Sequence, residues 1–507
     1  MKKKLLPALI VTGLIILVVI IMGITALINK YTPTKKTEDL KEYFNISSDD
    51  EVALIVNNEL SDYKAKIIDK KIYVDYKFVH DSLNSRFYWD ANENVLLYTT
   101  ASDIISAAAD SNSYSVTKQT NDFGYPIVKA TSDSALIALD YVKQYSNITF
   151  KSYDDPARIV ITSKWDEIDS ATVSKSTQVR VKGGIKSPIL KEVKKDDKIT
   201  ILDSGDKWDK VATEDGVIGY IKRKALSESK KTKLTNPDYE EETFTHIKKD
   251  KDICLAWNQV TSQSANSKVP QVISSTKGIN VMSPTWFYLN DNNGNLADIA
   301  SKDYVSYCHS QGIEVWGLFS NLENTNVDAA YVLTHTSTRT TLINQIMSAA
   351  FNYELDGVNI DFENITEAAY GDSYIEFIRE LSIKCHNNGI SLSVDVTVPA
   401  SFNKFFNRSD MAKFADYIVI MGYDEHYKGS DAGSVSSIPW VTEGVESTLK
   451  EVPADQIILG MPFYTRIWEL TPKEDDDAVT DTEDQSKYTV ASQVYSCLLY
   501  TSPSPRD

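Results

Sequence analysis

Short apolar runs separated by helical patterns fill the chain after residue 250, and they restrict its fold more than any other feature. Runs of this kind are typical of strands buried on both faces, and their alternation with helices predicts a parallel sheet covered by helices. Amphipathic helices are expected near Thr340–Ala350 and Tyr374–Cys385. Seven repeats favour a (β/α)8 barrel of the TIM type without its last βα unit. A doubly wound open sheet is the alternative, but no Gly-rich phosphate loop supports it. The runs are Ile253–Trp257, Ile279–Met282, Val315–Phe319, Val358–Phe362, Leu392–Val398, Tyr417–Met421 and Ile457–Met461.

The fourth run lies within a strongly polar stretch, Asp356-Gly357-Val358-Asn359-Ile360-Asp361-Phe362-Glu363-Asn364. Side chains alternate between the faces of a strand, so its apolar residues point toward the helices while Asn359, Asp361 and Glu363 point into the barrel. Glu363 comes last, at the carboxyl end where barrel enzymes hold their active sites. Two carboxylates on one face, with Cα atoms roughly 6.6 Å apart, favour a shared proton that keeps Glu363 available as an acid.

This stretch resembles the D-G-x-D-x-D-x-E motif of glycoside hydrolase family 18, the chitinase-like barrels. In that resemblance Glu363 matches the general acid/base and Asp361 matches the carboxylate that holds the acetamido group of the substrate. Asp356 opens the motif and has a supporting place. Asn359 stands where the common motif has an Asp, a departure that leaves Asp361 without its usual carboxylate neighbour.

A second match to the same family is Met421-Gly422-Tyr423-Asp424 at the end of the sixth run, similar to the family's M-x-Y-D. The resemblance implies that the Tyr423 hydroxyl supports the acetamido oxygen, with Met421 and Asp424 in supporting places. Sugar faces also need aromatic platforms. The candidates near strand ends are Trp286, Trp316 and Trp468, each of which could equally be core packing.

The family resemblance implies a glycosidase that needs no cofactor and no metal. It implies substrate-assisted retention, in which the 2-acetamido carbonyl attacks its own anomeric carbon while Glu363 protonates the leaving oxygen. Met421–Tyr427, Pro439–Val441 and Gly460–Tyr464 look similar to the branch of bacterial spore-cortex and cell-wall N-acetylglucosaminidases. Peptidoglycan is therefore the favoured substrate. Chitin oligomers are an alternative, and so is a non-catalytic glycan-binding barrel, although such proteins usually lack the acid.

The N-terminus predicts a membrane anchor. Lys2, Lys3 and Lys4 precede an uncharged run, Leu5–Ile28, whose 24 residues span roughly 36 Å as a helix, enough to cross a bilayer. A cleaved signal peptide is the alternative, but its apolar region is normally shorter. The basic cluster should stay cytoplasmic, so residues 1–28 form a single-pass anchor and the rest lies on the outer, cell-wall side of a Gram-positive cell.

Between the anchor and the barrel the sequence predicts a short linker, 29–50, and a duplicated α+β module, 51–165. Each copy has a strand, a helix (Phe78–Leu83 or Ala135–Val142) and a hairpin (Phe87–Tyr98 or Ile148–Ile161). The pattern resembles the copper amine oxidase N-terminal-like domain. No His or Cys cluster accompanies it, so no copper is expected, and a spacer role is favoured over wall binding.

Residues 172–228 change to short strands separated by turns, which predicts a small β-barrel. The strands Val179–Val181, Ile199–Leu202, Trp208–Val211 and Gly219–Ile221 resemble those of a bacterial SH3-like domain. That resemblance implies binding of a wall peptide or glycan, with a passive spacer as the alternative. A linker, 229–248, then leads to the catalytic barrel, 249–495.

Charge and composition exclude some functions. Asp and Glu number 71 against 53 Lys and Arg, a net charge of −18, which argues against nucleic-acid binding. Four Cys and six His are too scattered for a disulfide framework or a metal site. At the C-terminus a solvated acidic loop is expected at 472–477 and a helix at Val490–Tyr495. Residues 496–507 resemble translated sequencing adapter, so the natural protein is expected to be longer and Cys497 to have no function.

Overall fold

The computed structural model describes residues 2–496 apart from 275, 364, 366–367 and 474–484. The chain forms two compact units, of which the first comprises residues 1–85 and 126–241 and the second comprises residues 86–125 and 242–507. The chain therefore passes between the units three times. Residues 474–477 of the predicted acidic loop and residues 497–507 of the predicted tail lie outside the described residues.

The first unit begins with a single long helix, α1 (Lys2–Tyr31). From Ile10 to Tyr31 it is long and apolar enough to cross a membrane, and none of this stretch is buried against the rest of the chain. Side chains such as Leu14 and Val19 are more than half exposed. An unburied apolar face of this length needs an apolar surrounding, which is consistent with a membrane anchor or a signal sequence.

A seven-stranded sheet forms the larger part of the first unit, in the order β11-β12-β1-β2-β3-β10-β9. All neighbours are antiparallel except β1 and β12. The helix predicted at Phe78–Leu83 is confirmed, but Ala135–Ala138 is a strand because it pairs with β3 and β9, and the helix starts only at Leu139. The elements are α2 (Leu40–Tyr43), β1 (Glu51–Val56), β2 (Glu59–Ile68), β3 (Lys71–Asp75), α3 (Tyr76–Phe78) with a π-helical turn (Val79–Leu83), β9 (Val128–Ala130), β10 (Ala135–Ala138), α4 (Leu139–Tyr145), β11 (Thr149–Tyr153) and β12 (Arg158–Thr162).

A second sheet of seven antiparallel strands completes the first unit, in the order β15-β14-β18-β17-β16-β13-β19. The four strands predicted in this region are confirmed as β14, β16, β17 and β18. Gly219 in β18 is required by close packing, since a Cβ there would lie 2.6 Å from the Arg180 carbonyl oxygen. The strands are β13 (Glu167–Thr172), β14 (Thr177–Arg180), β15 (Ile189–Val193), β16 (Lys198–Asp203), β17 (Trp208–Thr213), β18 (Ile218–Lys222) and β19 (Lys230–Lys233).

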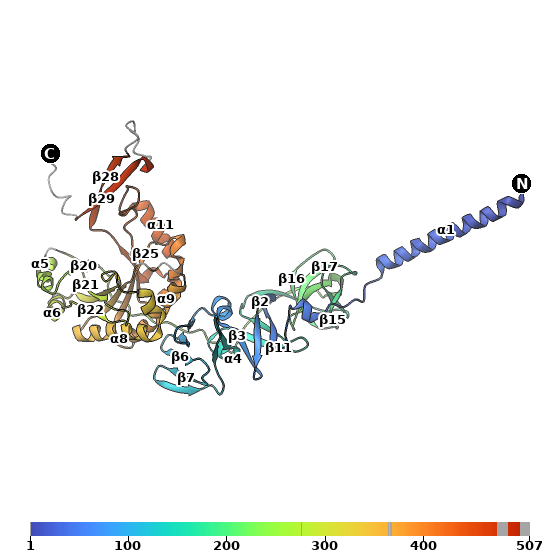
Figure 1. Cartoon of the computed structure of the whole chain (residues 1–507), viewed down its shortest axis with the longest axis horizontal. Coiled ribbons are helices and arrows are strands. Elements are labelled where there is room, and N and C mark those ends of the chain that lie inside the picture. Colours follow the sequence, from blue (N-terminus) through green and yellow to red (C-terminus); the bar gives the residue numbers. More distant parts are fainter. Residues whose placement is uncertain (1, 275, 364, 366–367, 474–484, 497–507) are drawn as a thin grey trace. The chain divides into compact units, whose positions relative to one another are not determined.

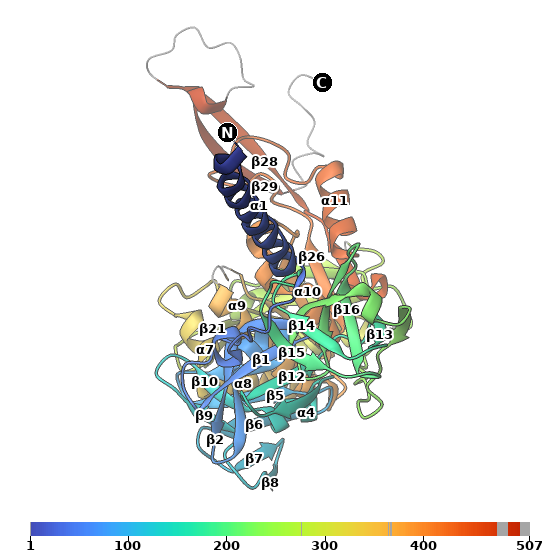
Figure 2. The same ribbon diagram turned by 90° about the vertical axis from the view of Figure 1, so that its right-hand side faces the viewer.

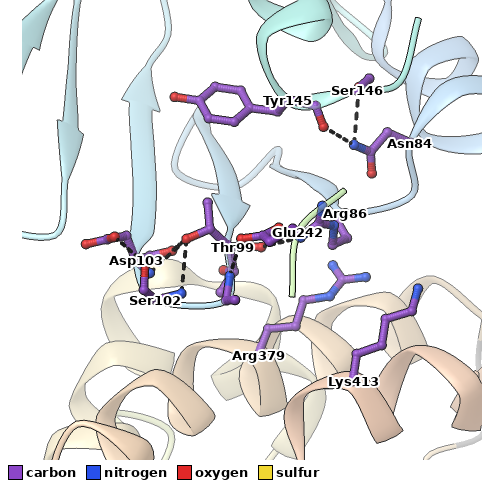
Figure 3. Close-up of polar contacts among 12 residues, drawn as sticks. Asn84, Arg86, Thr99, Ser102, Asp103, Tyr145, Ser146, Glu242, Arg379 and Lys413 are labelled. Atoms are coloured by element: carbon purple, nitrogen blue, oxygen red, sulfur yellow. Dashed lines mark hydrogen bonds and ion pairs between the residues drawn. The ribbon is translucent and has the colours of Figure 1, made fainter. Parts of the chain in front are cut away.

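The second unit contains a five-stranded antiparallel meander that the sequence places far from the barrel. It comprises β4 (Phe87–Asp90), β5 (Val95–Thr99), β6 (Ile104–Ala108), β7 (Ser113–Val116) and β8 (Gln119–Asp122), of which the first two form the predicted hairpin. Asp90 accepts hydrogen bonds from the backbone N–H (2.7 Å) and hydroxyl (2.6 Å) of Thr336 and so caps α8 (Thr336–Tyr353). Figure 3 shows Thr99 and the Arg86–Glu242 ion pair above the helix that carries Arg379.

The rest of the second unit is a curled parallel sheet whose strands follow the chain in the order β20-β21-β23-β24-β25-β26-β27. These are the seven predicted strands, in the predicted order, and β22 pairs with β21 beside them. The elements are β20 (Leu255–Asn258), α5 (Val269–Ser274), β21 (Val281–Leu289), β22 (Leu296–Asp298), α6 (Lys302–Ser310), β23 (Glu314–Ser320), α7 (Ala329–Thr334), α8, β24 (Gly357–Asp361), α9 (Ala368–His386), β25 (Ser391–Thr397), a 3-10 turn (Ser401–Phe406), α10 (Arg408–Phe414), β26 (Tyr417–Met421), α11 (Ile438–Thr448) and β27 (Ile457–Gly460).

The main core of the second unit lies between the parallel sheet and its helices. Val358 and Ile360 on the outer face of β24, and Phe362 just after it, are buried in this core. The Phe362 ring stacks on Phe377 of α9 with 5.5 Å between centroids. This confirms that the apolar residues of β24 face the helices. The polar residues of the strand must therefore face the other side, toward the inside of the curled sheet.

The helix predicted near the C-terminus is wrong. Residues predicted as a helix at Val490–Tyr495 belong to a strand, β29 (Tyr488–Ser496), which pairs antiparallel with β28 (Tyr464–Pro472) along the whole length of both strands. The cross-strand hydrogen bonds satisfy the backbone of this segment better than a short isolated helix could. The β28–β29 hairpin projects away from the parallel sheet (Figures 1 and 2).

Candidate active site

Asn359 lies fully buried in the middle of β24 and makes four hydrogen bonds inside the curled sheet. Its amide oxygen accepts from the Trp257 indole N–H (3.0 Å) and the Ser283 hydroxyl (3.0 Å), and its NH2 group donates to the Ser393 hydroxyl (3.1 Å) and to Asp395 Oδ1 (2.7 Å). An indole nitrogen can only donate, so the oxygen of Asn359 faces Trp257 and the NH2 group faces Asp395.

Asp361 follows on the same inner face of β24. Its carboxyl group is buried, and burial together with the nearby charges of Glu363 and Glu323 raises its pKa to about 7. Its Oδ1 atom is buried and has no hydrogen-bond partner among the residues that the structure describes. A buried acceptor without a donor is costly. The carboxyl group of Asp361 is therefore ready to receive an N–H or O–H group from a ligand.

Glu363 comes two residues later, just beyond the carboxyl end of the strand. Asn321 fixes its backbone from both sides: the Asn321 amide accepts from the Glu363 N–H (2.9 Å) and donates to the Glu363 carbonyl (2.9 Å). Partial burial raises the pKa of the Glu363 carboxyl, and the charges of Asp424 and Glu323 add to this. A partly exposed carboxyl with a raised pKa suits a general acid.

Asp395 is a third acid of this site that the sequence reading did not single out. It lies near the end of β25, whose parallel register pairs Asn359 with Ser393 and Ile360 with Val394, so Asp361 and Asp395 each come next along their strands. Burial raises the pKa of Asp395 well above its ordinary value, and the charge of Asp361 raises it further, while the hydrogen bond from the Asn359 amide opposes this. The alternation Ser391, Ser393, Asp395 between apolar residues was a signal that could have found it.

The end of β26 supplies the aromatic part of the site. Met421 is buried, and the Tyr423 hydroxyl has a raised pKa because of burial and of the charges of Asp395, Asp361 and Glu363. The Tyr423 ring meets Trp257 edge-on at 6.1 Å. Asp424 points to the rim, where it accepts a hydrogen bond from the Tyr464 hydroxyl at 2.7 Å. The structure thus brings Met421, Tyr423 and Asp424 to the same end of the sheet as Asp361 and Glu363.

Three of the predicted site residues lie elsewhere. Asp356 precedes the amino end of β24, where its carboxylate accepts from the Val315 N–H (2.8 Å) and contacts His309 (2.8 Å), so its place is structural. Trp286 and Trp316 are completely buried and offer no face to a sugar. Trp286 packs on Tyr304 in the core, while Trp316 fills the space left by Gly357, where a Cβ would lie 2.6 Å from its ring.

Trp468 remains a candidate sugar platform, because unlike Trp286 and Trp316 it is only partly buried. It lies on β28, is partly buried and donates its indole N–H to the Gly433 carbonyl at 2.9 Å. Trp257, at the end of β20, touches the acid cluster directly and was missed because it closes an ordinary apolar run.

A hollow of about 420 Å³ opens beside the acids. Glu363, Asp395, Thr397 and Met421 line one part of it, and phenylalanines from the turn after β25 line another. The Phe402 side chain is 78% exposed next to this hollow. An exposed aromatic ring beside a carboxylic acid suits a ligand with apolar faces and polar edges, such as a sugar ring.

Comparison with known proteins supports the resemblance of the acidic motif. Residues 319–497 match the family model described as "Glycosyl hydrolases family 18". The chain is 25% identical over 194 residues to the "Uncharacterized glycosylase YvbX" of Bacillus subtilis, covering 36% of this chain and 55% of that protein. It is 26% identical over 187 residues to the "Cortical fragment-lytic enzyme" of the same organism, covering 35% and 43%.

Among solved structures, the spore cortex-lytic enzyme SleL of Bacillus cereus matches with a TM-score of 0.40 and 18% identity, over 48% of this chain and 55% of that one. The chain spans about half the length of the curated relatives it matches. The predicted family resemblance is thus confirmed for residues 319–497. The SH3-like and amine oxidase-like resemblances and the predicted domain boundaries stay predictions.

Proposed function

We propose that this chain is a retaining glycosidase that hydrolyses N-acetylglucosamine linkages of peptidoglycan. The observation that carries the proposal is the buried Oδ1 of Asp361, two residues before Glu363, which has no hydrogen-bond partner among the described residues. An acceptor at this depth fits the N–H of a 2-acetamido group. We expect the Glu363 carboxyl, two residues further along the chain and with a raised pKa, to act on the glycosidic oxygen of the same sugar.

The proposed reaction has two steps. Glu363 donates its proton to the glycosidic oxygen, the bond from that oxygen to the anomeric carbon breaks, and the acetamido carbonyl oxygen attacks that carbon to give an oxazolinium ion. Asp361 holds the amide N–H and balances its positive charge, and Tyr423 donates its O–H to the acetamido oxygen. Glu363 then takes a proton from water, and the water oxygen bonds to the anomeric carbon. The bond from that carbon to the acetamido oxygen breaks, so the oxazolinium ring opens and the product keeps the original anomeric configuration.

Peptidoglycan is proposed as the substrate because a relative over this region is named a cortical fragment-lytic enzyme. The apolar helix α1 supports an anchored location, because Lys2–Lys4 form its first turn ahead of the apolar part and favour a cytoplasmic N-terminus. The rest of the chain would then lie on the outer side of the membrane, where peptidoglycan is found. A resemblance of residues 172–228 to SH3-like wall-binding domains agrees with this location.

The test compares the full-length chain with its Glu363→Gln variant on purified peptidoglycan and on chitin oligomers, with new reducing ends identified by mass spectrometry. We expect the variant to release reducing ends at least ~100-fold more slowly, because it cannot donate or accept the proton. Glu446→Gln on the exposed face of α11 is a matched control that should leave the rate unchanged.

Equal, background-level release by both proteins on both substrates would contradict the glycosidase. New reducing ends from chitin oligomers but not from peptidoglycan would show that chitin, and not peptidoglycan, is the substrate.

A further inference from the structure

The acid cluster has a feature that the family resemblance does not explain. Asn359 stands where the motif has a carboxylate, yet Asp361 does not lack a carboxyl neighbour. Asp361 and Asp395 each come one residue after the last registered pair of β24 and β25, Ile360 with Val394, and the charge of Asp361 acts on Asp395. Asn359 and Asp395 are in direct contact, with 2.7 Å between the amide nitrogen and Oδ1. The carboxyl and amide groups thus occupy neighbouring strands within one buried cluster.

We propose that Asp395 is the positioning residue that shares a proton with Asp361, and that the amide of Asn359 orients it for this. The proposal rests on the proposed function, in which Asp361 must be ionised to receive the amide N–H of the substrate. Asp395 then sets the charge of Asp361 by holding the proton itself.

The hydrogen bonds explain why residue 359 must be an amide when residue 395 is an acid. The indole N–H of Trp257 fixes an oxygen on one side of residue 359, so the other side faces Asp395. With Asn359 that side is an N–H donor. An Asp at position 359 would put two carboxyl oxygens 2.7 Å apart, which requires one more bound proton.

Among the described residues, the titratable groups that face Asp395 from the surrounding elements include no cation. They are Asp361 and Glu363 on and after β24, Tyr374 on α9, and Tyr423 after β26. Within the described parts of the chain, no ion pair involves Asp361, Glu363 or Asp395. Such a cluster lowers its electrostatic cost by keeping a proton. Asp395 is the most deeply enclosed of the three acids and the only one held by the Asn359 amide, so it is the natural place for the proton.

The proposal predicts a reciprocal pattern in the full-length chain. Asp395→Asn should lower kcat at least ~10-fold with a smaller change in KM, because Asp361 loses its proton partner. Asn359→Asp should also lower kcat, because it adds a carboxylate to the cluster. The double exchange Asn359→Asp with Asp395→Asn restores one acid and one amide in contact and keeps an acceptor for Trp257. Its kcat should exceed that of both single variants.

A second readout does not depend on activity. The slope of melting temperature against pH between pH 5 and 8 reports the protons that the folded chain holds in excess of the unfolded chain. The slope should be shallower than wild type in Asp395→Asn, steeper in Asn359→Asp and near wild type in the double exchange.

An Asp395→Asn variant with unchanged kcat and slope would overturn the proposal, as would a double exchange no better than the single variants. If the wild type hydrolyses no glycan, the proposed function fails. The three slopes still decide whether Asp395 shares the proton.

Discussion

One group of buried acids lies among the helices that cover the outer face of β24, and a second group lies inside the curled sheet. The two groups differ in which neighbouring side chains neutralise their charge. Among the helices, Arg379 of α9 donates to Glu376 (3.0 Å) and to Asp410 of α10 (3.0 Å), and Thr99 donates its hydroxyl to Glu376 at 2.8 Å. Inside the curled sheet, Asp361 and Asp395 have amide, indole and hydroxyl neighbours, and no ion pair reaches them in the described part of the chain.

The pKa values of Asp410 and Asp361 follow this difference. Burial acts to raise the pKa of Asp410, but the charge and hydrogen bonds of Arg379 outweigh it and the pKa is lowered. Burial raises the pKa of Asp361 to about 7 with no cation to oppose it. An aspartate is therefore a permanent ion that stabilises the helix layer at position 410. At position 361, inside the sheet, an aspartate can carry a proton, which suits it to catalysis.

The largest expected effect comes from removing the cation of the helix layer. Arg379→Met keeps the volume but leaves Glu376 and Asp410 buried without their partner, which should cost about 3–5 kcal/mol of unfolding free energy. For a domain of this size that corresponds to a fall in melting temperature of roughly 6–20 °C. Thermal unfolding followed by circular dichroism measures it.

Lys413→Met is the matched control for this variant. Lys413 also pairs with Asp410, at 3.5 Å, but its side chain is half exposed, so its loss should cost less than about 1 kcal/mol. If both variants lower the melting temperature equally, Glu376 and Asp410 do not depend on a buried cation. The proposed difference between the acids of the helix layer and those inside the sheet would then be wrong.

A smaller effect of opposite sign is expected inside the sheet. The pKa of Asp361 is about 7 in the folded chain against an ordinary 3.8, so its ionisation opposes folding. This cost is absent below pH ~4 and complete above pH ~7. Asp361→Asn, which never ionises, should therefore unfold with about 1–3 kcal/mol more free energy than wild type at pH 8 and show little difference at pH 4.5.

Urea unfolding at pH 8 and pH 4.5 measures this difference in unfolding free energy. An activity assay completes the test, because the stabilised Asp361→Asn variant should be inactive. A stability difference that is the same at both pH values would mean that Asp361 is not protonated in the folded chain.

The smallest expected effect concerns the rim of the same cluster. Asp424 raises the pKa of Glu363, which must be protonated for the first step, so activity is present below that pKa and lost as pH rises through it. Asp424→Asn keeps an acceptor for Tyr464 but removes the charge. The alkaline limb of kcat/KM should move to lower pH by about 0.3–0.5 unit, and by less at high salt. A limb that stays in place, as in the Glu446→Gln control, would exclude this coupling.

The sequence predicted those parts of the second unit that depend on periodicity. Seven apolar runs predicted seven parallel strands in order, and alternation along β24 correctly sent Val358 and Ile360 to the helices and Asp361 to the inside. These predictions succeed because a strand buried on one face fixes every second side chain.

Predictions of the site residues failed where a residue's place depends on which end of a strand it occupies or on a partner far away in the chain. Trp316 is near the start of its strand, so it is buried under Tyr417 rather than placed at the site. Asp395 was hidden in a run counted as apolar, and its role depends on Asn359 of the neighbouring strand. The contact between Thr99 and Glu376 joins residues far apart in the chain, which no local pattern reports.

The most direct test of the account is the anomeric form of the first product. Proton NMR during the first minutes of hydrolysis of a soluble, β-linked N-acetylglucosamine oligosaccharide distinguishes the two anomers before they equilibrate. Participation of the acetamido group held by Asp361 predicts that the β-anomer appears first and the α-anomer follows by mutarotation. Initial appearance of the α-anomer would contradict the assignment of Asp361 and Glu363.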